Sequence, residues 1–527
     1  MGHIKQLTIL GLRKFKEIEI KFNKNMNIIV GENEAGKSTI LEAISIVLNQ
    51  QYKNVDKSIV KELLNKDNVE DFLRKKRVSS LPKIKIEVKF EMTGKERDAH
   101  DFFGEESLSK KDAEYGILFE CKFDEECADR LAKEIGEGKI PYEYYIMSWM
   151  TFRGVPYKSI KKPFNSIFID TSAKDVNNSF NYFNRTLFSS KYADAEKMNA
   201  KNSFRSNLEE AFNKLNLPDI DVNRKFGIND KKVILEAIIS VYEDGIPLEN
   251  KGGGMESLIK THIALDRSQS NLDVIFMEEP ENHLCFSNMN KMLDEIINKR
   301  DLAQIILTTH SNMIASRLDL RNVLWIKGNH TISLTDIDDK VAKFFTKADD
   351  NSFLQLLLSE KIILVEGATE YLLLPDMFRR VTGKTLEESK VVIISCNGVS
   401  YDNYLLIAKK TGKRIAVITD NDKSTKKIKK MEEFNGNVEN INQHIFMDGD
   451  VQGWTWEKCI YDLNQEYLDK NIKVEKDAEY LFHGKNYGKV LGKILNNKVE
   501  TAYNILESKH ELKIPKYVED AIKWINE

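Results

Sequence analysis

The chain has 527 residues, with 79 Lys and Arg against 82 Asp and Glu, so its formal net charge is −3. At about 100–200 residues per domain this length predicts two to four domains, and a hydrophobic content of 41% excludes a disordered chain. A mean hydropathy of −0.43, with no apolar run near about 18 residues, argues against a membrane span, and the near-zero charge does not indicate a globally basic nucleic-acid binder.

The five cysteines are scattered, and no pair has C-x-x-C spacing. This pattern disfavours both a zinc ribbon and a disulfide framework. The N-terminus reads MGHIKQLTIL, without an apolar segment followed by a small-residue cleavage site, so no export signal is expected. We therefore expect a reduced protein in the cytoplasm.

The first part of the chain predicts a mixed α/β domain. Residues 18–22 alternate apolar and charged side chains, as a half-buried strand does, and an apolar run at 26–30 ends at Gly31 before a helical pattern. Residues 175–245 are rich in Asn, Lys, Phe and Ala with weak helical periodicity, and we interpret them as a helical insertion. Further strands are expected at 84–92, 117–123, 144–152, 274–277 and 305–307.

The sequence turns polar near residue 350, where we place a boundary between domains 1–350 and 351–527. Beyond it, short apolar strands alternate with helical stretches, which predicts βαβ units and a parallel sheet. No heptad run is long enough for a coiled-coil arm. These strands are expected at 362–365, 391–395, 415–419 and 445–447.

A phosphate-binding loop follows the strand at 26–30. The glycines let backbone N–H groups face a polyphosphate, and the start of the following helix adds a positive dipole. Lys37 would reach the β- and γ-phosphates, and Ser38 would bind Mg²⁺. A glycine-rich turn with an incidental lysine is the alternative. The motif G-x-x-x-x-G-K-[ST] is matched by Gly31, Glu32, Asn33, Glu34, Ala35, Gly36, Lys37 and Ser38, followed by Thr39.

Two carboxylates follow the apolar strand at 274–277. Glu278 is placed to hold the water shell of Mg²⁺, and Glu279 to polarise an attacking water, because ligands bind at the C-terminal ends of such strands. A further strand ends in Thr308-Thr309-His310, and His310 is placed to hydrogen-bond a γ-phosphate. A structural acidic loop and a structural histidine are the alternatives.

These motifs resemble the ATPase heads of the ABC family in its SMC/RecF/OLD branch, which implies ATP as the nucleotide. In such heads a signature loop from a second protomer closes on the nucleotide. The counterpart here is Lys251-Gly252-Gly253-Gly254, with Gly252 and Gly254 as the candidate contacts. Gly253 stands where a polar residue is frequent, which puts a hydroxyl contact to the γ-phosphate in doubt. A flexible triple-glycine turn is the alternative.

A second set of carboxylates lies beyond residue 360. Glu366 follows the strand at 362–365, and Glu370 lies four residues on, near the first turn of the next helix. Asp420 and Asp422 follow the strand at 415–419, and in an extended segment residues i and i+2 face the same side. Carboxylates with no His or Cys nearby favour Mg²⁺ or Mn²⁺ over zinc.

This arrangement resembles the Toprim fold, and an ABC-type ATPase followed by Toprim resembles the OLD family of nucleases. The resemblance implies an α/β architecture with an ABC-type ATPase head, a helical insertion and a C-terminal Toprim domain. It also implies a later metal-binding glutamate, for which Glu457 is chosen, and a late lysine, for which Lys485 is chosen while Lys489 and Lys493 compete. Within the family, the sequence looks like the nuclease subunit of the Gabija phage-defence system.

The function that this resemblance implies is nucleotide-regulated, metal-dependent cleavage of DNA in anti-phage defence. It further implies a homo-oligomer, a dimer or a tetramer, which the helical insertion could hold together, and a helicase-like accessory protein. The lysine-rich stretch 423–430 can bind phosphates. The near-zero net charge is therefore an average over acidic and basic regions of the chain. Two alternatives stay open: a DNA-binding SMC/RecF-like ATPase in DNA repair whose Toprim acids are not catalytic, and an SMC-like structural protein.

Overall fold

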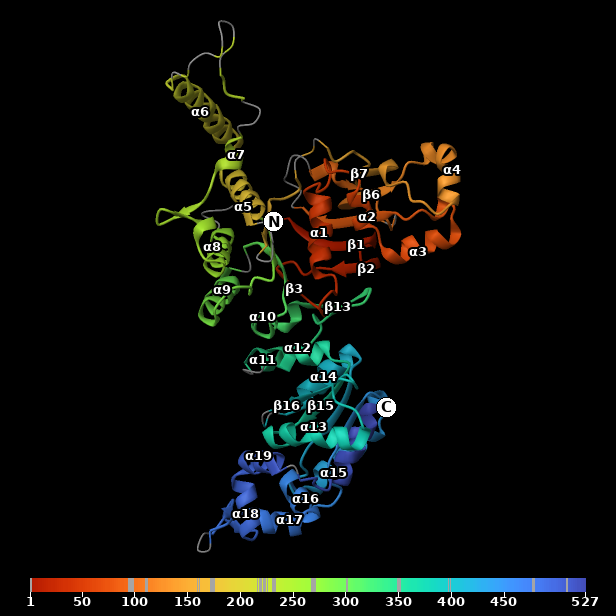
Figure 1. The fold of residues 1–527 in the computed structure, drawn as a ribbon, viewed down its shortest axis with the longest axis vertical. Helices are drawn as coiled ribbons and strands as arrows, with labels where there is room; N and C mark the ends of the chain where they lie inside the picture. Colours follow the sequence, from red (N-terminus) through yellow and green to blue (C-terminus); the bar gives the residue numbers. More distant parts are fainter. Residues whose placement is uncertain are drawn as a thin grey trace. The chain divides into compact units, whose positions relative to one another are not determined.

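The computed structural model divides into two compact units, Met1–Asp336 and Ile337–Glu527 (Figure 1). The cut falls before the expected boundary near residue 350. The structure describes residues 2–92, 99–109, 112–158, 160, 162–170, 176–215, 217, 220, 224, 226–229, 234–266, 272–299, 302–347, 352–396, 398, 400–475, 479–508 and 510–527.

An antiparallel sheet forms one layer of the first unit, with strand order β2-β1-β4-β6-β5 and β7 paired to β6. Its residues alternate between buried and exposed along β2, as the sequence pattern predicted. The strands are β1 (His3–Leu12), β2 (Phe15–Lys21), β4 (Ile84–Glu91), β5 (Phe103–Gly104), β6 (Glu114–Phe123) and β7 (Tyr145–Thr151), and α2 (Ile59–Leu63), α3 (Lys66–Lys75) and α4 (Ala128–Gly136) lie in the same part of the chain.

The second sheet of this unit has the order β14-β13-β3-β12-β11-β8, and it is parallel except for β14. Helix α1 (Lys37–Leu48) lies in the same apolar core as both sheets, since Ile40, Ile44 and Val47 are fully buried there. The elements are β3 (Met26–Val30), β8 (Ser166–Asp170), β11 (Val274–Glu278), β12 (Gln304–Thr308), β13 (Val323–Lys327), β14 (His330–Ser333), α8 (Gly253–Leu265), α9 (Phe286–Lys299) and α10 (Asn312–Arg317).

Helices occupy the described part of the segment interpreted as an insertion. Helix α5 (Val176–Lys191) packs on β8 and α7 (Leu235–Ile238), whereas α6 (Asp194–Asn213) buries none of its residues. A short hairpin of β9 (Tyr242–Glu243) and β10 (Ile246–Pro247) precedes α8. Within the described chain, α6 therefore gains little from tertiary packing.

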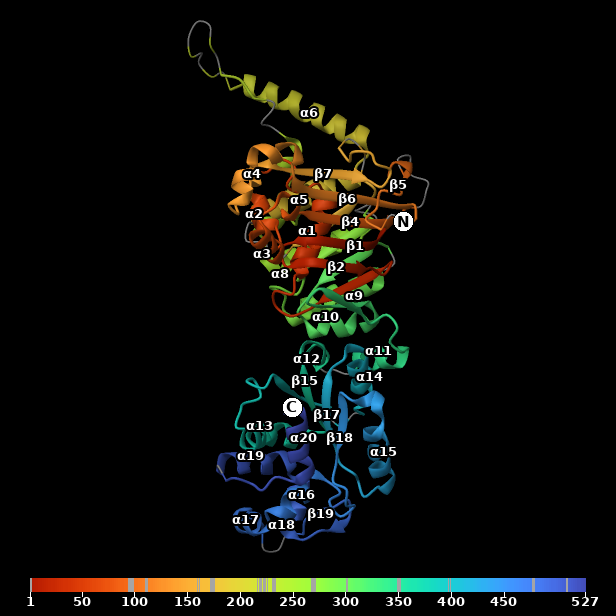
Figure 2. The ribbon, with the colours of Figure 1, turned by 90° about the vertical axis from the view of Figure 1, so that its right-hand side faces the viewer.

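The second unit is built on a parallel sheet in the order β16-β15-β17-β18. Helices α13 and α20 lie on one side of this sheet, and α14 and α15 on the other (Figure 2). The sheet elements are β15 (Lys361–Val365), α13 (Ala368–Thr382), β16 (Val391–Ser395), α14 (Asp402–Thr411), β17 (Arg414–Ile418), α15 (Thr425–Gly436), β18 (Gln443–Phe446) and α20 (Lys516–Asn526). Between β18 and α20 lie α16 (Trp456–Leu463), α17 (Gln465–Asn471), β19 (Leu481–Phe482), β20 (Lys485–Asn486), α18 (Lys489–Asn496) and α19 (Lys498–Ser508).

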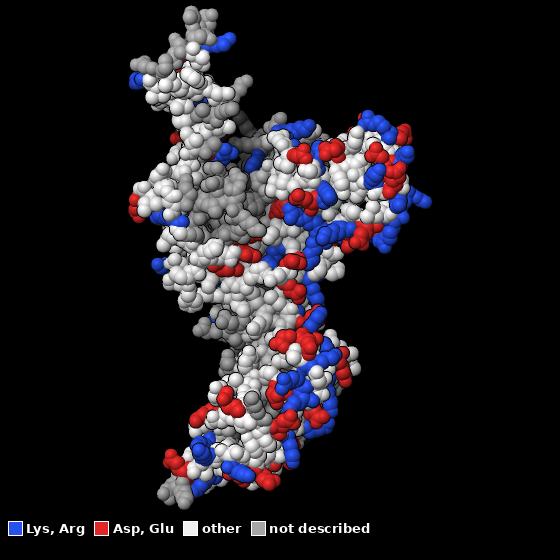
Figure 3. Space-filling view, in the orientation of Figure 1, with Lys and Arg blue, Asp and Glu red and all other residues white. Residues whose placement is uncertain are grey.

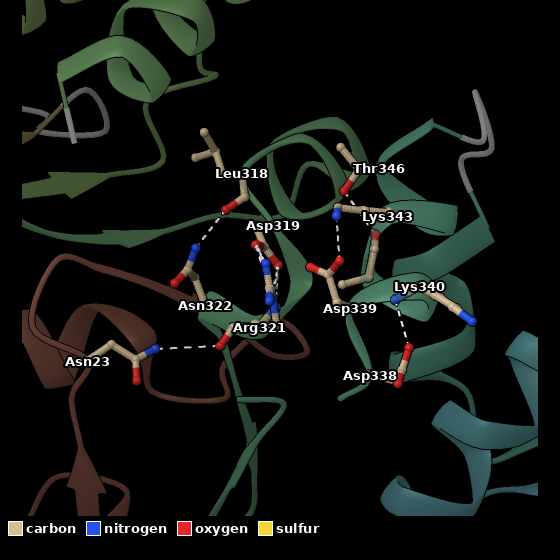
Figure 4. Close-up of polar contacts among 11 residues, drawn as sticks. Asn23, Leu318, Asp319, Arg321, Asn322, Asp338, Asp339, Lys340, Lys343 and Thr346 are labelled. Carbon is tan, nitrogen blue, oxygen red and sulfur yellow. Dashed lines mark hydrogen bonds and ion pairs between the residues drawn. The ribbon is translucent and has the colours of Figure 1, made fainter. Parts of the chain in front are cut away.

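Aromatic packing explains why the second unit begins before residue 350. Phe345, on α11 (Asp339–Lys347), packs against Phe353 of α12 (Ser352–Leu358) and against Tyr404 of α14, with ring centroids 5.5 and 5.1 Å apart. The polar contacts drawn in Figure 4 each join residues of one unit: Arg321 pairs with Asp319 in the first, and Lys343 with Asp339 in the second.

Charged residues of both signs are interspersed on the face shown in Figure 3. Where charged residues gather on this face, the two signs lie close together. None of the helices in the described ranges is long and apolar enough to cross a membrane.

Candidate functional sites

The predicted phosphate-binding loop lies between β3 and α1. Gly36 has a φ of 93°, and a Cβ there would collide with the ring of Phe15, so the turn requires glycine. Lys37 is buried, and its ammonium donates to the carbonyl oxygens of Gly31 and Glu32 at 3.1 and 3.2 Å. The Lys37 side chain is therefore folded back over the turn, as expected of a loop that binds a polyphosphate.

The carboxylates of the acidic loop after β11 act electrostatically on Lys37. Burial lowers the pKa of Lys37, and the charges of Glu279, Glu281 and Glu278 oppose that shift. Strand β11 pairs with β12, and β12 pairs with β3, so the three candidate loops leave the same edge of one sheet. This places the phosphate-binding loop, the acid pair and the histidine around one region.

His310 and Glu279 are neighbours, with Nε2 of the histidine 3.4 Å from Oε1 of the carboxylate. Partial burial and the charge of Lys37 lower the pKa of His310, which favours the neutral imidazole. Glu279 has a φ of 44° and is held by Asn282, whose amide donates to it at 2.9 Å. A neutral histidine beside a fixed carboxylate can orient a water or a phosphate oxygen.

Glu281 is a residue that motif reasoning left without a role. Its Oε1 accepts hydrogen bonds from the Thr309 hydroxyl at 2.6 Å and from the His310 backbone N–H at 2.8 Å. Its Oε2 is buried and accepts no hydrogen bond from the described residues. Glu281 therefore ties the acid loop to the histidine loop, and only its position two residues after Glu279 could have signalled it.

The candidate signature glycines differ in their surroundings. A Cβ on Gly254 would overlap the backbone carbonyl oxygen of His283, so the start of α8 touches the acid loop there. A Cβ on Gly252 would meet open space. Lys251 forms an ion pair with Glu243 of β9. Only Gly254 is required by close packing within the described chain.

At the second site, Glu366 lies directly after β15 and joins the end of the neighbouring strand. Its Oε1 accepts a hydrogen bond from the Thr419 hydroxyl and another from the Asp420 backbone N–H at 3.2 Å. Asp420 in turn accepts from the Thr455 hydroxyl at 2.7 Å and from the Trp456 N–H at 2.8 Å. The ends of β15 and β17 and the start of α16 are thus bonded together through carboxylates.

Two further carboxylates complete this cluster. Glu370, in the first turn of α13, is 7% exposed, and Glu457, in the first turn of α16, is 4% exposed. Burial, with the charges of Glu457, Asp420 and Glu366, raises the pKa of Glu370 to about 7. Burial, with the charges of Glu366 and Glu457, likewise raises the pKa of Asp420 to about 7. We call Glu366, Glu370, Asp420 and Glu457 the acidic cluster.

The extended geometry expected for Asp420 and Asp422 is wrong. Strand β17 ends at Ile418, and Asp422 has a φ of 49°, so the two carboxylates do not lie on one face of a strand. The Asp422 side chain is 60% exposed and forms an ion pair with Lys427. The buried Asn421 explains the turn, because its amide donates to three backbone carbonyls of the loop at 448–453.

One cavity of about 370 Å³ is lined by both Asp422 and Glu366. It lies between the start of α14 and α15, at the edge where β15 ends. Lys427 and Lys430 of α15 line its other side, and Tyr401 contributes to its wall. The cavity therefore combines acidic and basic groups beside the acidic cluster.

A lysine that the sequence did not single out joins the acidic cluster. Lys498, at the start of α19, donates to Glu457 Oε2 at 2.9 Å. Burial alone would lower its pKa, but the charge and hydrogen bond of Glu457 outweigh burial and raise it. Lys485 lies exposed on β20, and its role stays a prediction. Lys498 follows Glu457 by 41 residues, so no local pattern could have identified it.

The donor set of the acidic cluster fits a hard divalent cation. All its ligands would be carboxylate oxygens, and burial together with the repulsion of neighbouring carboxylates raises the pKa of Glu370 and of Asp420 to about 7. As they stand, no three His, Cys, Asp or Glu side chains in the described ranges are gathered closely enough to enclose a metal. Binding would therefore draw the carboxylates together.

Two family models match the chain. The model described as an AAA domain covers residues 6–362, and the model described as "Overcoming lysogenization defect protein-like, TOPRIM domain" covers residues 357–422. The two matches join near the start of β15. Together they support the architecture predicted from the motifs.

Matches to individual proteins are partial. The chain is 38% identical to the "DNA replication and repair protein RecF" of Clostridium kluyveri over 93 residues, 18% of this chain and 25% of that protein. It is 27% identical to the "Old nuclease" of Escherichia phage P2 over 142 residues, 25% of this chain and 24% of that protein. The chain thus spans about a quarter of the length of these relatives.

Solved structures of SMC heads also align with the chain. A head bound to the C-winged helix domain of ScpA covers 63% of this chain and 99% of its own length, at 14% identity and a TM-score of 0.34. The SMC head domain from Thermotoga maritima covers 62% of this chain and 97% of its own, at 15% identity and a TM-score of 0.29. These superpositions are too loose to bear on function.

Proposed function

The chain belongs to the family defined by the AAA domain and carries an OLD-like TOPRIM domain, and from this premise we propose that it is a nucleotide-regulated, divalent-metal-dependent DNA endonuclease. The observation that carries the proposal is the acidic cluster with Lys498 at the edge of β15 and β17. A sheet edge with only a structural role does not need four carboxylates and an ammonium. Two of these carboxyls, those of Glu370 and Asp420, have pKa values raised to about 7. The match to Old nuclease lies in agreement with this chemistry.

The acidic cluster would hold one or two Mg²⁺ or Mn²⁺ ions, with Asp422 as a further ligand if it leaves Lys427. Bound metal supplies Lewis-acid polarisation of the phosphate and a water acidified toward hydroxide. Lys498 keeps its proton because its pKa is raised, so it can neutralise charge that develops on the phosphate. The hydroxyl of Thr455 lies 2.7 Å from Asp420 Oδ2 and 2.6 Å from Glu457 Oε2, so it can donate its one hydrogen to either carboxylate.

The first unit would act as a nucleotide-dependent gate. Lys37 and the loop backbone would bind the phosphates of ATP, and Ser38 and Glu278 would hold its Mg²⁺. Glu279, which accepts a hydrogen bond from Asn282 and lies beside His310, would polarise the attacking water. Gly252 and Gly254 would meet the nucleotide of a second protomer. Nucleotide state would then alter cleavage at the second unit, which is a coupling between two distinct sites.

The biological setting that fits best is anti-phage defence, as a relative of the Gabija nuclease subunit. We propose a homo-oligomer, a dimer or a tetramer, in the cytoplasm, with a helicase-like accessory protein as partner. The exposed helix α6 supports an assembly, since it buries no residue within the described chain. A light-scattering mass of two or four times 60.8 kDa is expected, and a mass of one chain would contradict the assembly.

A second candidate function is a DNA-binding ATPase of DNA repair whose Toprim acids are not nucleolytic. The match to the "DNA replication and repair protein RecF" supports it, at 38% identity over 93 residues. The two candidates differ in one respect, because only the first breaks phosphodiester bonds.

Incubation of the purified full chain with supercoiled plasmid separates them. The assay contains Mg²⁺, Mn²⁺ or EDTA, each with and without ATP, because the direction of nucleotide control is open. We expect nicked or linear plasmid in at least one metal condition and none with EDTA. Intact plasmid in every condition would sink the nuclease and leave the repair ATPase.

A further inference from the structure

We propose that Lys423, held in a cage of aromatic side chains, is a preorganised ligand for a DNA phosphate that flanks the one being cleaved. This inference rests on the proposed DNA substrate and adds a residue that positions it. Its starting point is an ammonium group beside the acidic cluster that is fixed in place and, in the described part of the chain, has no carboxylate partner.

Two rings hold the Lys423 ammonium. Its Nζ lies 4.3 Å from the ring centroid of Trp454 and 4.9 Å from that of Tyr487, and it donates a hydrogen bond to the Tyr487 hydroxyl at 2.8 Å. The two rings are 5.4 Å apart, and Phe482 stacks on Trp454 from β19. Cation–π contacts of this kind favour a cation at the ring face without neutralising its charge.

The backbone below the cage is tightly determined. Asp422 and Lys423 have φ values of 49° and 61°, which is uncommon for consecutive residues that carry side chains. Asn421 accepts a hydrogen bond from the Lys423 N–H at 2.9 Å, and Trp454 accepts one from the Asp422 N–H at 3.1 Å. The cage is therefore bonded directly to Asp422, which lines the cavity that also contains Glu366.

The neighbouring lysines differ from Lys423 in their partners. Lys427 forms an ion pair with Asp422, and Lys430 lies 3.9 Å from Asp402. Within the described ranges, no carboxylate lies within ion-pairing distance of Lys423, whose contacts are aromatic rings, the Tyr487 hydroxyl and the backbone. A fixed cation with unused donors beside a candidate nuclease centre is suited to a phosphate oxygen.

The cage explains why the ammonium is fixed there. A free lysine on an exposed loop would lose rotamer entropy when it met a phosphate, whereas Trp454 and Tyr487 have already restricted this side chain. Trp454, from the loop before α16, and Tyr487, directly after β20, thereby position the charge that meets the DNA.

Salt dependence of DNA binding tests the proposal without cleavage. The affinity of the full chain for a fluorescent duplex is measured with Ca²⁺ held constant in place of Mg²⁺, over a range of NaCl concentrations. Lys423→Gln is expected to weaken binding several-fold and to reduce the slope of log K against log [salt] by about 0.9, the loss of one phosphate contact. Lys423→Arg should restore the slope. Lys516→Gln, which removes an exposed lysine paired with Asp520 on α20, should leave it unchanged.

The cage variants test the aromatic part of the argument. Trp454→Leu should reduce the slope in the wild-type background and have no further effect in Lys423→Gln, because the ring acts only through the lysine. Melting temperatures of all variants report whether they fold. An unchanged slope in Lys423→Gln, an equal loss for Trp454→Leu in both backgrounds, or no DNA binding by the wild type would overturn the proposal. If the slope changes as expected while plasmid stays intact under every metal condition, the nuclease proposal fails and the phosphate ligand stands.

Discussion

At the scale of single residues, the acidic cluster concentrates negative charge that the folded chain only partly neutralises. Glu457 has Lys498, and Glu366 and Asp420 have hydroxyl and backbone donors, whereas Glu370 has a backbone donor and is repelled by three other carboxylates. Burial, with the repulsion of the neighbouring carboxylates, disfavours the charged forms of Glu370 and Asp420 and raises their pKa values to about 7. Loss of the Glu370 and Asp420 protons as the pH rises toward 7 therefore lowers the stability of the metal-free folded protein.

Glu370→Gln should stabilise the metal-free protein. The pKa of Glu370 is raised from an ordinary 4.5 to about 7, so the stability that its proton confers is complete below pH 4.5 and lost as pH rises toward 7. At pH 8 in EDTA, we expect the free energy of unfolding to exceed that of the wild type by about 1–3 kcal/mol, and the difference to vanish near pH 4. Urea unfolding at several pH values measures it.

The matched control for that prediction is Glu432→Gln, which removes an exposed carboxylate from α15. It should change stability by less than about 0.5 kcal/mol at every pH. A destabilised Glu370→Gln at pH 8 would mean that the carboxylate is better satisfied than its surroundings indicate.

Lys498 and Lys485 compete for the role of the late lysine. Lys498→Met should lower the cleavage rate about 10²-fold or more, because it removes the ammonium bonded to the Glu457 carboxylate. Lys485→Met should cut at close to the wild-type rate, since that side chain is exposed on β20. Single-turnover rates of plasmid nicking decide between them, and the reverse order would reinstate Lys485.

Some of these residues could be predicted from the sequence, and others could not. The glycines and Lys37 of the phosphate-binding loop are recognisable because their chemistry needs fixed local spacing. Glu281 and Lys498 were missed because their partners are distant in sequence and meet only through the fold. The side chain of Asp422 was misplaced because Asn421 turns the backbone before the pair can lie extended.

At the scale of elements, the approach of α8 to the acid loop is the tightest feature near the nucleotide site. The helix begins where Gly254 touches the carbonyl of His283, and a side chain there would push the two elements apart. The signature motif therefore has a packing role in its own protomer, apart from any contact with a second one.

Gly254→Ala should destabilise the first unit by about 1–3 kcal/mol, because its Cβ has no space beside His283. Gly252→Ala should stay within about 0.5 kcal/mol, since its Cβ meets open space and its φ of −60° suits alanine. Thermal unfolding of the two variants measures the difference. Equal melting temperatures would show that α8 can shift without cost.

Strands and helices were predicted better than their ends. The predicted strands before both sites are present as β3, β11, β15 and β17. They could be predicted because a short apolar run followed by a polar loop is typical of a buried strand in a parallel sheet. The start of the second unit could not be predicted from the polar stretch near 350, because the ring contacts of Phe345 with Phe353 and Tyr404 set it.

At the scale of the whole molecule, each of the two units carries one candidate site. The net charge of −3 indicated neither site, because carboxylates at the acid loop and the acidic cluster offset lysines elsewhere. Joining an AAA domain to a TOPRIM domain supports control of one by the other.

Lys37→Ala tests that control. The substitution removes the cation of the phosphate-binding loop, so ATP should no longer alter cleavage, whichever direction it acts in the wild type. The ratio of plasmid cleavage rates with and without ATP should differ from one in the wild type and equal one in the variant. A ratio that is the same in both proteins would mean that the two sites are not coupled.

The central claim is that the acidic cluster cuts DNA, and cleavage by two glutamate variants from the two ends of β15 tests it most directly. Glu366→Ala removes the carboxylate that joins β15 to Asp420, and Glu360→Ala removes an exposed one that lies 3.7 Å from Lys390. With Mg²⁺ or Mn²⁺ and supercoiled plasmid, Glu360→Ala should cut at the wild-type rate and Glu366→Ala should not cut detectably. Equal cleavage by Glu366→Ala and the wild type would contradict the account and place the activity at another site or in a contaminant.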